Sequence, residues 1–413
     1  MSSPTAYAPQ RAADPGAQGA GIPVLLLAWN YPPDNAAASP RPFLFAKYLR
    51  RHGYACTVVT AAAQAAAGPA DVHCVPDRIG FSHKVVRKLL LPGAFGLGWV
   101  RPALATAKRL HAEKRFELIL STSPPVATHF AALALKRATG LKWVADLQDP
   151  VAGNPARQAR AYPYIDAIAE RAVFRYADAL IANTGSTAAF WNGRYPQWAE
   201  KTYVMNNGYD PETAVEPAPI PARPYRVLAH VGALSAFRPP TLVLRSIDRL
   251  IARGLLDPAS LRVSLLGPPT DYVEDPALTA ALTEKGVLEQ LPPVPLAEAR
   301  RAAAEADYLF LVDITSGNAG LQVPSKILDY IRIGRPILAL TTRNSPVDRI
   351  LAQSGVPYAA VYPDLSACDF DQRVLSLLSL PTEPTAASDW FRDTFDATAH
   401  ARRLAAILDG VRA

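Results

Sequence analysis

The segments that decide the fold begin with Val24-Leu25-Leu26-Leu27-Ala28, a continuous apolar run. Such a run is typical of a strand that is buried on both faces of a parallel sheet. Residues 43–51 then follow a helical period that ends at His52-Gly53, and residues 56–60 (Cys-Thr-Val-Val-Thr) form a second strand-like run. A strand, a helix and a strand in this order predict a βαβ unit with parallel strands.

The same alternation recurs along most of the chain. It predicts further strands at 118–120, 143–146, 179–182, 202–205, 227–231, 263–266, 308–312 and 336–340. It predicts helices near 125–139, 165–176, 240–253, 297–305, 325–333 and 346–353. The fold class is therefore α/β, with two Rossmann-like doubly wound parallel-sheet domains facing a cleft. In this class a ligand is expected at the carboxyl ends of the strands.

A proline-rich segment separates the two series of strands. It contains Pro211, Pro217, Pro219, Pro221 and Pro224. Because such segments form extended linkers, we expect a linker at 209–224, between an N-terminal Rossmann-like domain at 22–208 and a C-terminal Rossmann-like domain at 225–385. Helical periodicity in residues 386–413 predicts a C-terminal helix that packs back on the N-terminal domain.

The composition is that of a globular protein, since half of the 413 residues are apolar and 19% are charged. Residues 1–21 contain no apolar run, so we expect a disordered tail and no signal peptide, and no run elsewhere is long enough to span a bilayer. Cys56, Cys74 and Cys368 belong to no CxxC pair and have no histidine at metal-ligand spacing. We therefore expect a reducing, cytoplasmic compartment.

The strongest local signal for a binding site is the segment Val323-Pro324-Ser325-Lys326-Ile327-Leu328-Asp329. Pro324 or Ser325 begins the helix expected here, and the N–H groups of a first helical turn attract an anion. Lys326 adds a positive charge in the same turn, and Asp329 lies three residues further on the same face. The pattern fits a diphosphate and a neighbouring ribose; the alternative is an ordinary helix with an ion pair.

Arg238 is a second candidate cation for phosphate. It follows the strand at 227–231 and Gly232, where the backbone can approach a ligand closely, and Gly267 follows the next strand in the same way. A solvated loop arginine and a structural turn are the alternatives. The sequence has no GxGxxG or GxxxxGK[ST] motif after a strand, and no DxD pair in a metal-binding loop. These absences argue against a dinucleotide oxidoreductase and a P-loop enzyme, and they predict phosphate binding without a metal.

Two segments of the first half could serve the acceptor. Asp149 lies at the carboxyl end of the strand at 143–146, where it could take a proton from an acceptor hydroxyl or orient it. The loop at 30–41 is rich in small residues, so Asn30 and Ser39 could cradle an acceptor, with Arg41 near a phosphate. The alternative for Asp149 is an aspartate that caps the following turn, and the alternative for the loop at 30–41 is a surface loop without a function in binding.

Residues 78–109 mix basic and apolar side chains, with Phe95 and Trp99 at the apolar edge. The net charge of the chain is +7, and such a stretch can lie on an anionic membrane face. The alternative is an amphipathic helix packed on its own domain. Nucleic acid binding would need wider basic patches with aromatic side chains for stacking, so we expect no nucleic acid partner.

Four groups of motifs, in their order along the chain, resemble the retaining glycosyltransferases of the GT-B fold, and specifically glycosyltransferase family 4 (group 1). The resemblance extends from about Val24 to Leu408. The motifs are Tyr31-Pro32-Pro33 with Ser39, Arg41 and His52-Gly53-Tyr54; Ser123-Pro124-Pro125 with Asp146-Leu147-Gln148-Asp149; Glu170 with Ala177-Asp178-Ala179 and Asn206-Asn207-Gly208; and Val323-Pro324-Ser325-Lys326 with Gly334-Arg335-Pro336.

The resemblance implies a nucleotide-sugar donor, UDP- or GDP-linked, whose diphosphate is neutralised by Lys326 and Arg238 without cofactor or metal. Asp329 matches the second carboxylate of the family's paired-glutamate motif, which holds the donor ribose. The first glutamate of that pair is replaced by Leu321, so that backbone groups around Gly320 would substitute. The basic residue that usually follows Gly232 is also absent, because Ala233 occupies its position.

The implied function is transfer of a sugar, with retention, to a saccharide or lipid-linked acceptor in surface polysaccharide biosynthesis. The enzyme would be cytoplasmic and peripheral on the inner face of the membrane. Two alternatives stay open. One is a nucleotide-sugar epimerase of the same architecture, and the other is a non-catalytic protein that keeps the fold, which Leu321 favours.

Overall fold

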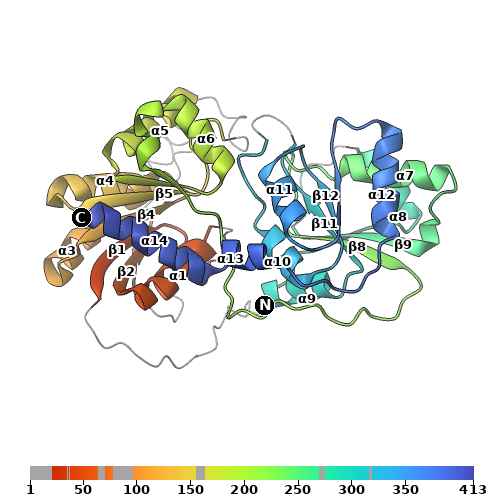
Figure 1. Cartoon of the computed structure of the whole chain (residues 1–413), viewed down its shortest axis with the longest axis horizontal. Helices are drawn as coiled ribbons and strands as arrows, with labels where there is room; N and C mark the ends of the chain where they lie inside the picture. Colours follow the sequence, from red (N-terminus) through yellow and green to blue (C-terminus); the bar gives the residue numbers. More distant parts are fainter. Residues whose placement is uncertain are drawn as a thin grey trace. The chain divides into compact units, whose positions relative to one another are not determined.

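The computed structural model describes residues 21–34, 36, 38–63, 70–77, 96–154, 163–268, 275–315 and 319–413. The chain divides into two compact units, each with its own sheet (Figure 1). The first unit ends at Asp210 and also contains Phe395–Ala413, whereas the second unit is Pro211–Thr394. The chain therefore crosses between the units twice.

The first unit is built on a parallel sheet with the strand order β3-β2-β1-β4-β5-β6-β7. Its strands are β1 (Ile22–Ala28), β2 (Tyr54–Thr60), β3 (Asp71–Cys74), β4 (Leu118–Ser123), β5 (Lys142–Leu147), β6 (Ala179–Ala182) and β7 (Thr202–Val204). The direction of winding reverses between β1 and β4. The sheet is therefore doubly wound, and its switch point lies between these two strands.

Helices cover both faces of this sheet. They are α1 (Pro40–Leu49), α3 (Leu97–Lys114), α4 (Ala127–Thr139), α5 (Pro163–Tyr176), α6 (Gly185–Arg194) and α14 (Ala397–Arg412). Successive side chains of β1 point to opposite faces, as the pleat requires. Leu25 packs in a core with Trp99 of α3, whereas Leu26 packs in a second core with Leu404 of α14. The apolar run of β1 is thus buried on both sides.

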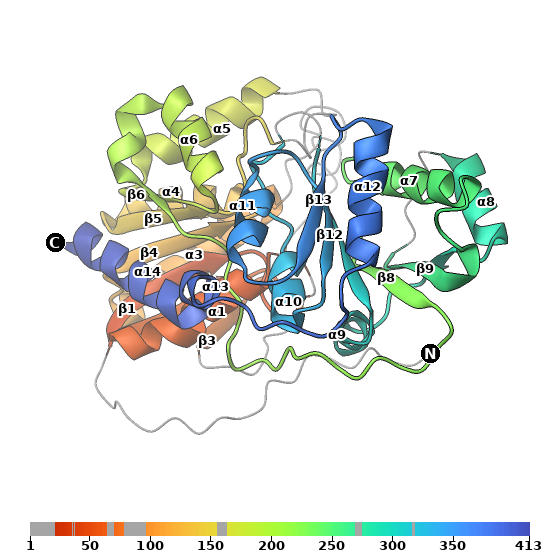
Figure 2. The same ribbon diagram turned by 45° about the vertical axis from the view of Figure 1, so that its right-hand side comes forward.

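The second unit has a parallel sheet with the order β10-β9-β8-β11-β12-β13. Its strands are β8 (Arg226–Val231), β9 (Leu261–Leu266), β10 (Leu288–Leu291), β11 (Tyr308–Val312), β12 (Ile337–Leu340) and β13 (Tyr358–Val361). Its helices are α7 (Thr241–Ala252), α8 (Pro276–Glu284), α9 (Leu296–Ala304), α10 (Lys326–Ile333), α11 (Pro346–Gln353), α12 (Ala367–Leu378) and α13 (Asp389–Phe395). α7 and α12 lie side by side and share one core (Figure 2). The predicted class of two Rossmann-like doubly wound domains is confirmed.

Short edge strands are the elements that the sequence pattern missed. β3, β10 and β13 each have four residues and lie at the edges of their sheets. An edge strand is covered less than a central one, so β3 and β10 carry few buried side chains and show no apolar run. Residues 386–413 also differ from the single helix expected. Asp396 has an extended backbone and accepts a hydrogen bond from the Thr398 N–H, so it ends α13 and caps α14.

Candidate functional site

The carboxyl edge of the second sheet gathers the strongest candidate residues. β8 ends at Val231 and is followed by Gly232, while β11 ends at Val312 and is followed by Asp313. These strands are neighbours at the switch point, because the winding reverses between β8 and β11. α10 begins at the same edge with Lys326, whose ammonium approaches His230 at the end of β8. Every residue of this site belongs to the second unit.

Lys326 is held by a histidine. Its Nζ lies 2.9 Å from Nε2 of His230, which is buried. The other ring nitrogen, Nδ1, lies 3.0 Å from the carbonyl oxygen of Phe310, and a carbonyl can only accept. Nδ1 therefore carries the proton, and Nε2 accepts from the ammonium. Burial, with the nearby Lys326, lowers the pKa of His230 to about 3, so the imidazole is neutral at neutral pH.

The site holds two cations and lacks a carboxylate partner for them. Burial and the neighbouring Arg238 lower the pKa of Lys326 to about 7. Nε of Arg238 is buried without a hydrogen-bond partner. Within the described ranges, neither Lys326 nor Arg238 forms an ion pair with Asp or Glu. Positive charge that is desolvated and not paired directly with a carboxylate favours binding of an anion.

Asp313 is a buried acid of the same site. The charge of Arg238 acts on it, but its oxygens are bonded to other groups. Oδ1 accepts the N–H of Ile314 at 2.8 Å, and Oδ2 accepts the hydroxyl of Thr341 at 2.8 Å. Burial raises the pKa of Asp313 to about 6. These bonds fasten the loop after β11 to the end of β12, which fixes one wall of the site.

Gly232 and Gly267, which we predicted to bind the donor, lie where the backbone packs too closely for a larger side chain. A Cβ on Gly267 would lie 2.6 Å from the carbonyl oxygen of Gly232, and a Cβ on Gly232 would lie 3.1 Å from Nζ of Lys326. The role of Gly267 is thus to let the loop after β8 pack against the end of β9. Gly320 has φ +85, a left-handed conformation that favours glycine.

The start of α10 differs in detail from the expectation. Pro324 is buried, and Ser325 is the exposed N-cap residue, whose side chain caps no N–H group. Asp329 does not pair with Lys326. Its carboxylate lies 3.0 Å from Nε of Arg300 on α9, so the two charges expected on one helix face have different partners.

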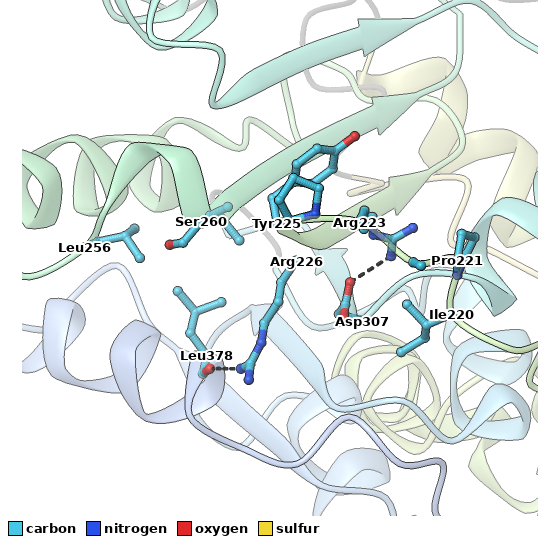
Figure 3. Close-up of a pocket in the computed structure, with 12 residues that line it drawn as sticks. Ile220, Pro221, Arg223, Tyr225, Arg226, Leu256, Ser260, Asp307 and Leu378 are labelled. Carbon is cyan, nitrogen blue, oxygen red and sulfur yellow. Dashed lines mark hydrogen bonds and ion pairs between the residues drawn. The ribbon is translucent and has the colours of Figure 1, made fainter.

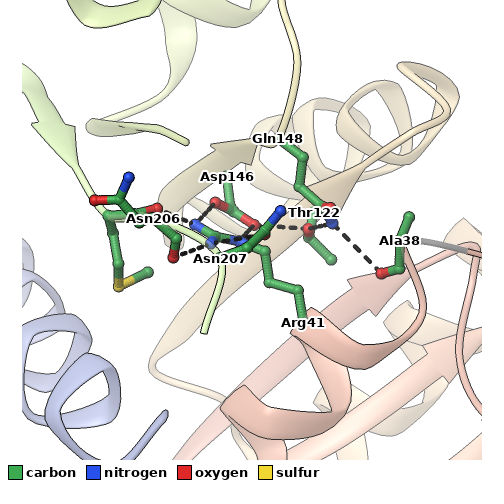
Figure 4. A network of polar contacts seen from close by, with 8 residues as sticks. Ala38, Arg41, Thr122, Asp146, Gln148, Asn206 and Asn207 are labelled. Carbon is green, nitrogen blue, oxygen red and sulfur yellow. Dashed lines mark hydrogen bonds and ion pairs between the residues drawn. The ribbon is translucent and has the colours of Figure 1, made fainter. Parts of the chain in front are cut away.

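Arg41 lies in a buried network of the first unit (Figure 4). Its guanidinium binds both carboxylate oxygens of Asp146, at 2.7 and 2.9 Å. Its remaining bonds go to the carbonyl oxygens of Met205 and Asn206 and to the side chain of Asn207. All five N–H groups are therefore occupied. These bonds support a structural role for Arg41, and its expected position near an acceptor phosphate stays a prediction.

The other candidates of the first unit lie at the carboxyl ends of its strands. Asn30 donates to the carbonyl oxygen of Pro124 at 2.9 Å, and Ser39 is buried with a hydroxyl that has no hydrogen-bond partner among the described residues. Asp149 is half-buried in the loop after β5. Glu170 holds this loop by accepting the N–H groups of Val151 and Ala152 at 2.9 and 3.0 Å.

Sequence reasoning missed His230, Asp313 and the pairing of Arg41 with Asp146. A signal existed for two of them. His230 is a polar residue inside an apolar strand segment, and Asp313 comes directly after the apolar run of β11. Their side-chain partners, Thr341 and Lys326, come from other segments of the chain, so the pattern alone cannot assign them a role.

A pocket of about 520 Å³ lies at the opposite, amino-terminal edge of the second sheet (Figure 3). Residues that precede or begin strands line it, among them Arg226, Leu261 and Asp307. Arg223 of the proline-rich segment pairs with Asp307 at 2.7 Å inside it. Ligands of doubly wound sheets bind at the carboxyl ends, so this pocket is not the candidate site.

Only part of the stretch that we expect to contact a membrane, residues 78–109, can be followed in the structure, because residues 78–95 lie outside the described residues. From Gly96 onward the stretch belongs to the first unit. Trp99 is fully buried and its indole N–H donates to the carbonyl oxygen of Val75 at 3.0 Å, so α3 packs on its own domain and Trp99 cannot contact lipid.

Among the described helices, none has the length and apolar character needed to cross a bilayer. In the described part of the chain, no group of three or more His, Cys, Asp or Glu side chains could hold a metal ion.

Comparisons with known proteins agree with this architecture. Residues 43–213 match the family described as Glycosyltransferase Family 4. A search of curated protein sequences finds no match.

Solved structures with the same fold cover nearly the whole chain. Alr3699/HepE of Anabaena, in complex with UDP, has a TM-score of 0.64 and 16% identity, over 94% of this chain and 99% of its own. Sucrose-phosphate synthase (tll1590) of Thermosynechococcus elongatus has a TM-score of 0.67 and 13% identity, over 94% and 98%. The lipopolysaccharide outer core galactosyltransferase WaaB, in its apo form, has a TM-score of 0.62 and 11% identity, over 94% and 99%. The chain therefore has the GT-B fold, and its residues 43–213 resemble Glycosyltransferase Family 4.

Proposed function

We propose that this protein transfers a sugar from a nucleotide-sugar and that the donor's diphosphate binds at the start of α10. The observation that carries the proposal is the pair of cations, Lys326 and Arg238, which have no carboxylate partner among the described residues. A diphosphate supplies the missing negative charge, and the N–H groups at the start of α10 add to its binding. The UDP complex of HepE supports a nucleotide diphosphate as the ligand class.

In the proposed reaction the bond between the anomeric carbon and the diphosphate oxygen breaks, while the acceptor hydroxyl forms the new bond to that carbon. The leaving diphosphate gains charge as the bond breaks. Lys326, Arg238 and the helix N–H groups stabilise that charge without a metal. Stabilisation by fixed cations and dipoles is usually the largest single contribution to catalysis. We propose retention of the anomeric configuration.

We propose that Asp149 serves the acceptor side. It lies in the loop after β5, which Glu170 fastens, at an edge of the sheet where ligands of this fold bind. Its carboxylate would orient the acceptor hydroxyl or take its proton. Replacement by asparagine is expected to lower kcat by about 10²-fold or more, while the affinity for UDP stays unchanged. An equal loss of UDP affinity would contradict this role.

The first experiment is isothermal titration of the full-length protein with UDP and with GDP. Lys326→Ala is expected to lower the affinity for the preferred nucleotide at least about tenfold, the typical effect of removing a charge-assisted hydrogen bond. Lys285→Ala is the matched control, because Lys285 is a half-exposed lysine of the same unit that pairs with Asp248. If neither nucleotide binds the wild type, the proposal fails.

The second experiment follows turnover with a panel of UDP- and GDP-sugars. Nucleotide release that needs a saccharide or lipid-linked acceptor, and that continues in EDTA, is the expected result. Conversion of the donor to an epimer in the absence of acceptor would replace the proposal by an epimerase. Association of residues 78–109 with anionic membrane stays a prediction, which flotation of liposomes with Lys84, Arg87 and Lys88 changed to Glu tests.

We propose a saccharide or lipid-linked acceptor in surface polysaccharide biosynthesis. The lipopolysaccharide galactosyltransferase WaaB and WaaG, a glycosyltransferase involved in lipopolysaccharide biosynthesis, share the fold over 94% of this chain, which supports this class of acceptor. The proposed place of action is the cytoplasm, at the inner face of the membrane.

A further inference from the structure

His230 is the one side chain that bonds directly to the ammonium of Lys326 among the described contacts. It is 1% exposed, it stacks edge-on against Phe310 at 6.0 Å between ring centroids, and its Nδ1–H donates to the Phe310 carbonyl oxygen. Two contacts with Phe310 of β11 therefore fix the ring. A fixed acceptor at Nε2 restricts the flexible lysine to one position.

In that position the ammonium of Lys326 lies at the carboxyl end of β8, where we propose that the diphosphate binds. The ammonium lies over Gly232, within 3.1 Å of the point where a Cβ would stand. Lysine carries three N–H donors, and His230 uses one of them. Two donors remain for a ligand. Lysine has four rotatable bonds in its side chain, so holding it before the ligand arrives removes an ordering cost from binding.

Several charged or titratable side chains lie on the elements around the imidazole of His230. From α10 it faces Lys326, and the hydroxyl of Tyr330 accepts the N–H of Val231 nearby at 2.9 Å. Arg238 lies close enough to lower the pKa of His230 slightly. On the side of β11, Asp313 is bonded to Thr341 and to the backbone. Neither Asp313 nor Asp329, which pairs with Arg300, contacts the imidazole.

We propose that His230 is a positioning residue for the donor: it holds the ammonium of Lys326 over Gly232 with a neutral acceptor, and so leaves the positive charge of the site for the diphosphate. The inference rests on the proposed function. A carboxylate in place of the imidazole would hold the lysine equally well, but it would neutralise the charge that the diphosphate needs. A neutral acceptor satisfies geometry and charge together.

Two near-isosteric variants separate this role from a structural one. In His230→Gln the side-chain amide reaches the place of Nε2, so it keeps an acceptor for Lys326 and loses the bond to Phe310. In His230→Asn the amide reaches the place of Nδ1, so it keeps the bond to Phe310 and loses the contact with Lys326. We expect UDP affinity to fall about tenfold in His230→Asn and to recover most of that loss in His230→Gln. A purely structural role predicts the reverse order.

A double-mutant cycle measures the coupling between His230 and Lys326 directly. His230→Asn is combined with Lys326→Ala, and UDP affinity is measured for the wild type, both single variants and the double variant. We expect His230→Asn to have no further effect once Lys326 is removed. An effect that is equal in both backgrounds overturns the inference.

The same cycle distinguishes the two proposals. If Lys326→Ala weakens UDP binding and His230→Asn does not, the donor site stands and the positioning role fails. If Lys326→Ala has no effect on UDP binding, the donor site itself fails. His230→Glu adds a third measurement, because a carboxylate that holds Lys326 is expected to weaken UDP binding by more than Asn does; stronger binding would contradict the role of a neutral acceptor.

Discussion

Replacing Arg41 by alanine is expected to destabilise the first unit strongly, although Arg41 lies next to a segment that resembles an acceptor site. Arg41 is 4% exposed, and Asp146 is fully buried. The variant leaves the carboxylate of Asp146 with only the hydroxyl of Thr122, at 2.7 Å, as its side-chain donor. It also removes the donors of the carbonyl groups of Met205 and Asn206.

The expected loss of unfolding free energy is about 3–5 kcal/mol, the effect of removing one partner of a buried ion pair. This is a large part of the roughly 5–15 kcal/mol that stabilises an ordinary domain. The control is Arg109→Ala on α3 of the same unit. Arg109 is 56% exposed and forms an i,i+4 pair with Glu113, so its loss is expected to be below about 0.5 kcal/mol.

Urea denaturation followed by tryptophan fluorescence measures the effect, because five of the six tryptophans lie in the first unit. A two-domain protein need not unfold in a single step, so the transition of the first unit is compared between variants and its slope is checked. The reasoning is refuted if Arg41→Ala is no less stable than Arg109→Ala. It is also refuted if Arg41→Ala keeps full stability and loses only acceptor turnover.

Three further outcomes follow from the second unit. The pKa of Lys326 is lowered to about 7, so its ammonium loses its proton as pH rises above that value, and UDP affinity is expected to fall by up to about tenfold per pH unit in calorimetric titrations. The phosphates of UDP, with a pKa near 6, are already ionised in this range and do not cause the change. Lys326→Arg should flatten the profile, and a flat wild-type profile would contradict the lowered pKa. The folded protein binds fewer protons at Lys326 than the unfolded chain between about pH 7 and 10.4, so this residue is expected to make the urea midpoint rise with pH across that window. Gly267→Ala places a Cβ 2.6 Å from the carbonyl oxygen of Gly232 and should lower both the unfolding free energy and the UDP affinity. The control is Gly193→Ala, in helix α6 with open space around the new Cβ, which should raise the unfolding free energy by about 0.5–1 kcal/mol. Equal shifts of the thermal midpoint in the two variants would refute the packing argument.

The periodicity of the sequence predicted the central strands and the helices between them. Parallel strands that are buried on both faces must be continuous apolar runs, so residues 24–28 and 308–312 could be recognised without any knowledge of their neighbours. The start of α10 could be predicted for the same reason, since Pro324 and Ser325 are local signals for a helix N-terminus.

Edge strands and side-chain partners could not be predicted in this way. β10 has only one buried residue, so burial imposed little pattern on its sequence. The partners of a charged side chain depend on which distant segments the fold brings together. Arg41 meets Asp146 across 105 residues, and Lys326 meets His230 across 96.

Local sequence therefore determined where strands, helices and a helix N-terminus form, because those features depend on the period of apolar residues and on backbone chemistry. Only the tertiary structure decided which charges are used internally and which are left for a ligand. Arg41 and Lys326 are both basic residues at a helix start. One is paired with a buried carboxylate and the other contacts a neutral imidazole. That difference in partners supports a structural role for Arg41 and is the reason why we propose Lys326 as the anion-binding residue.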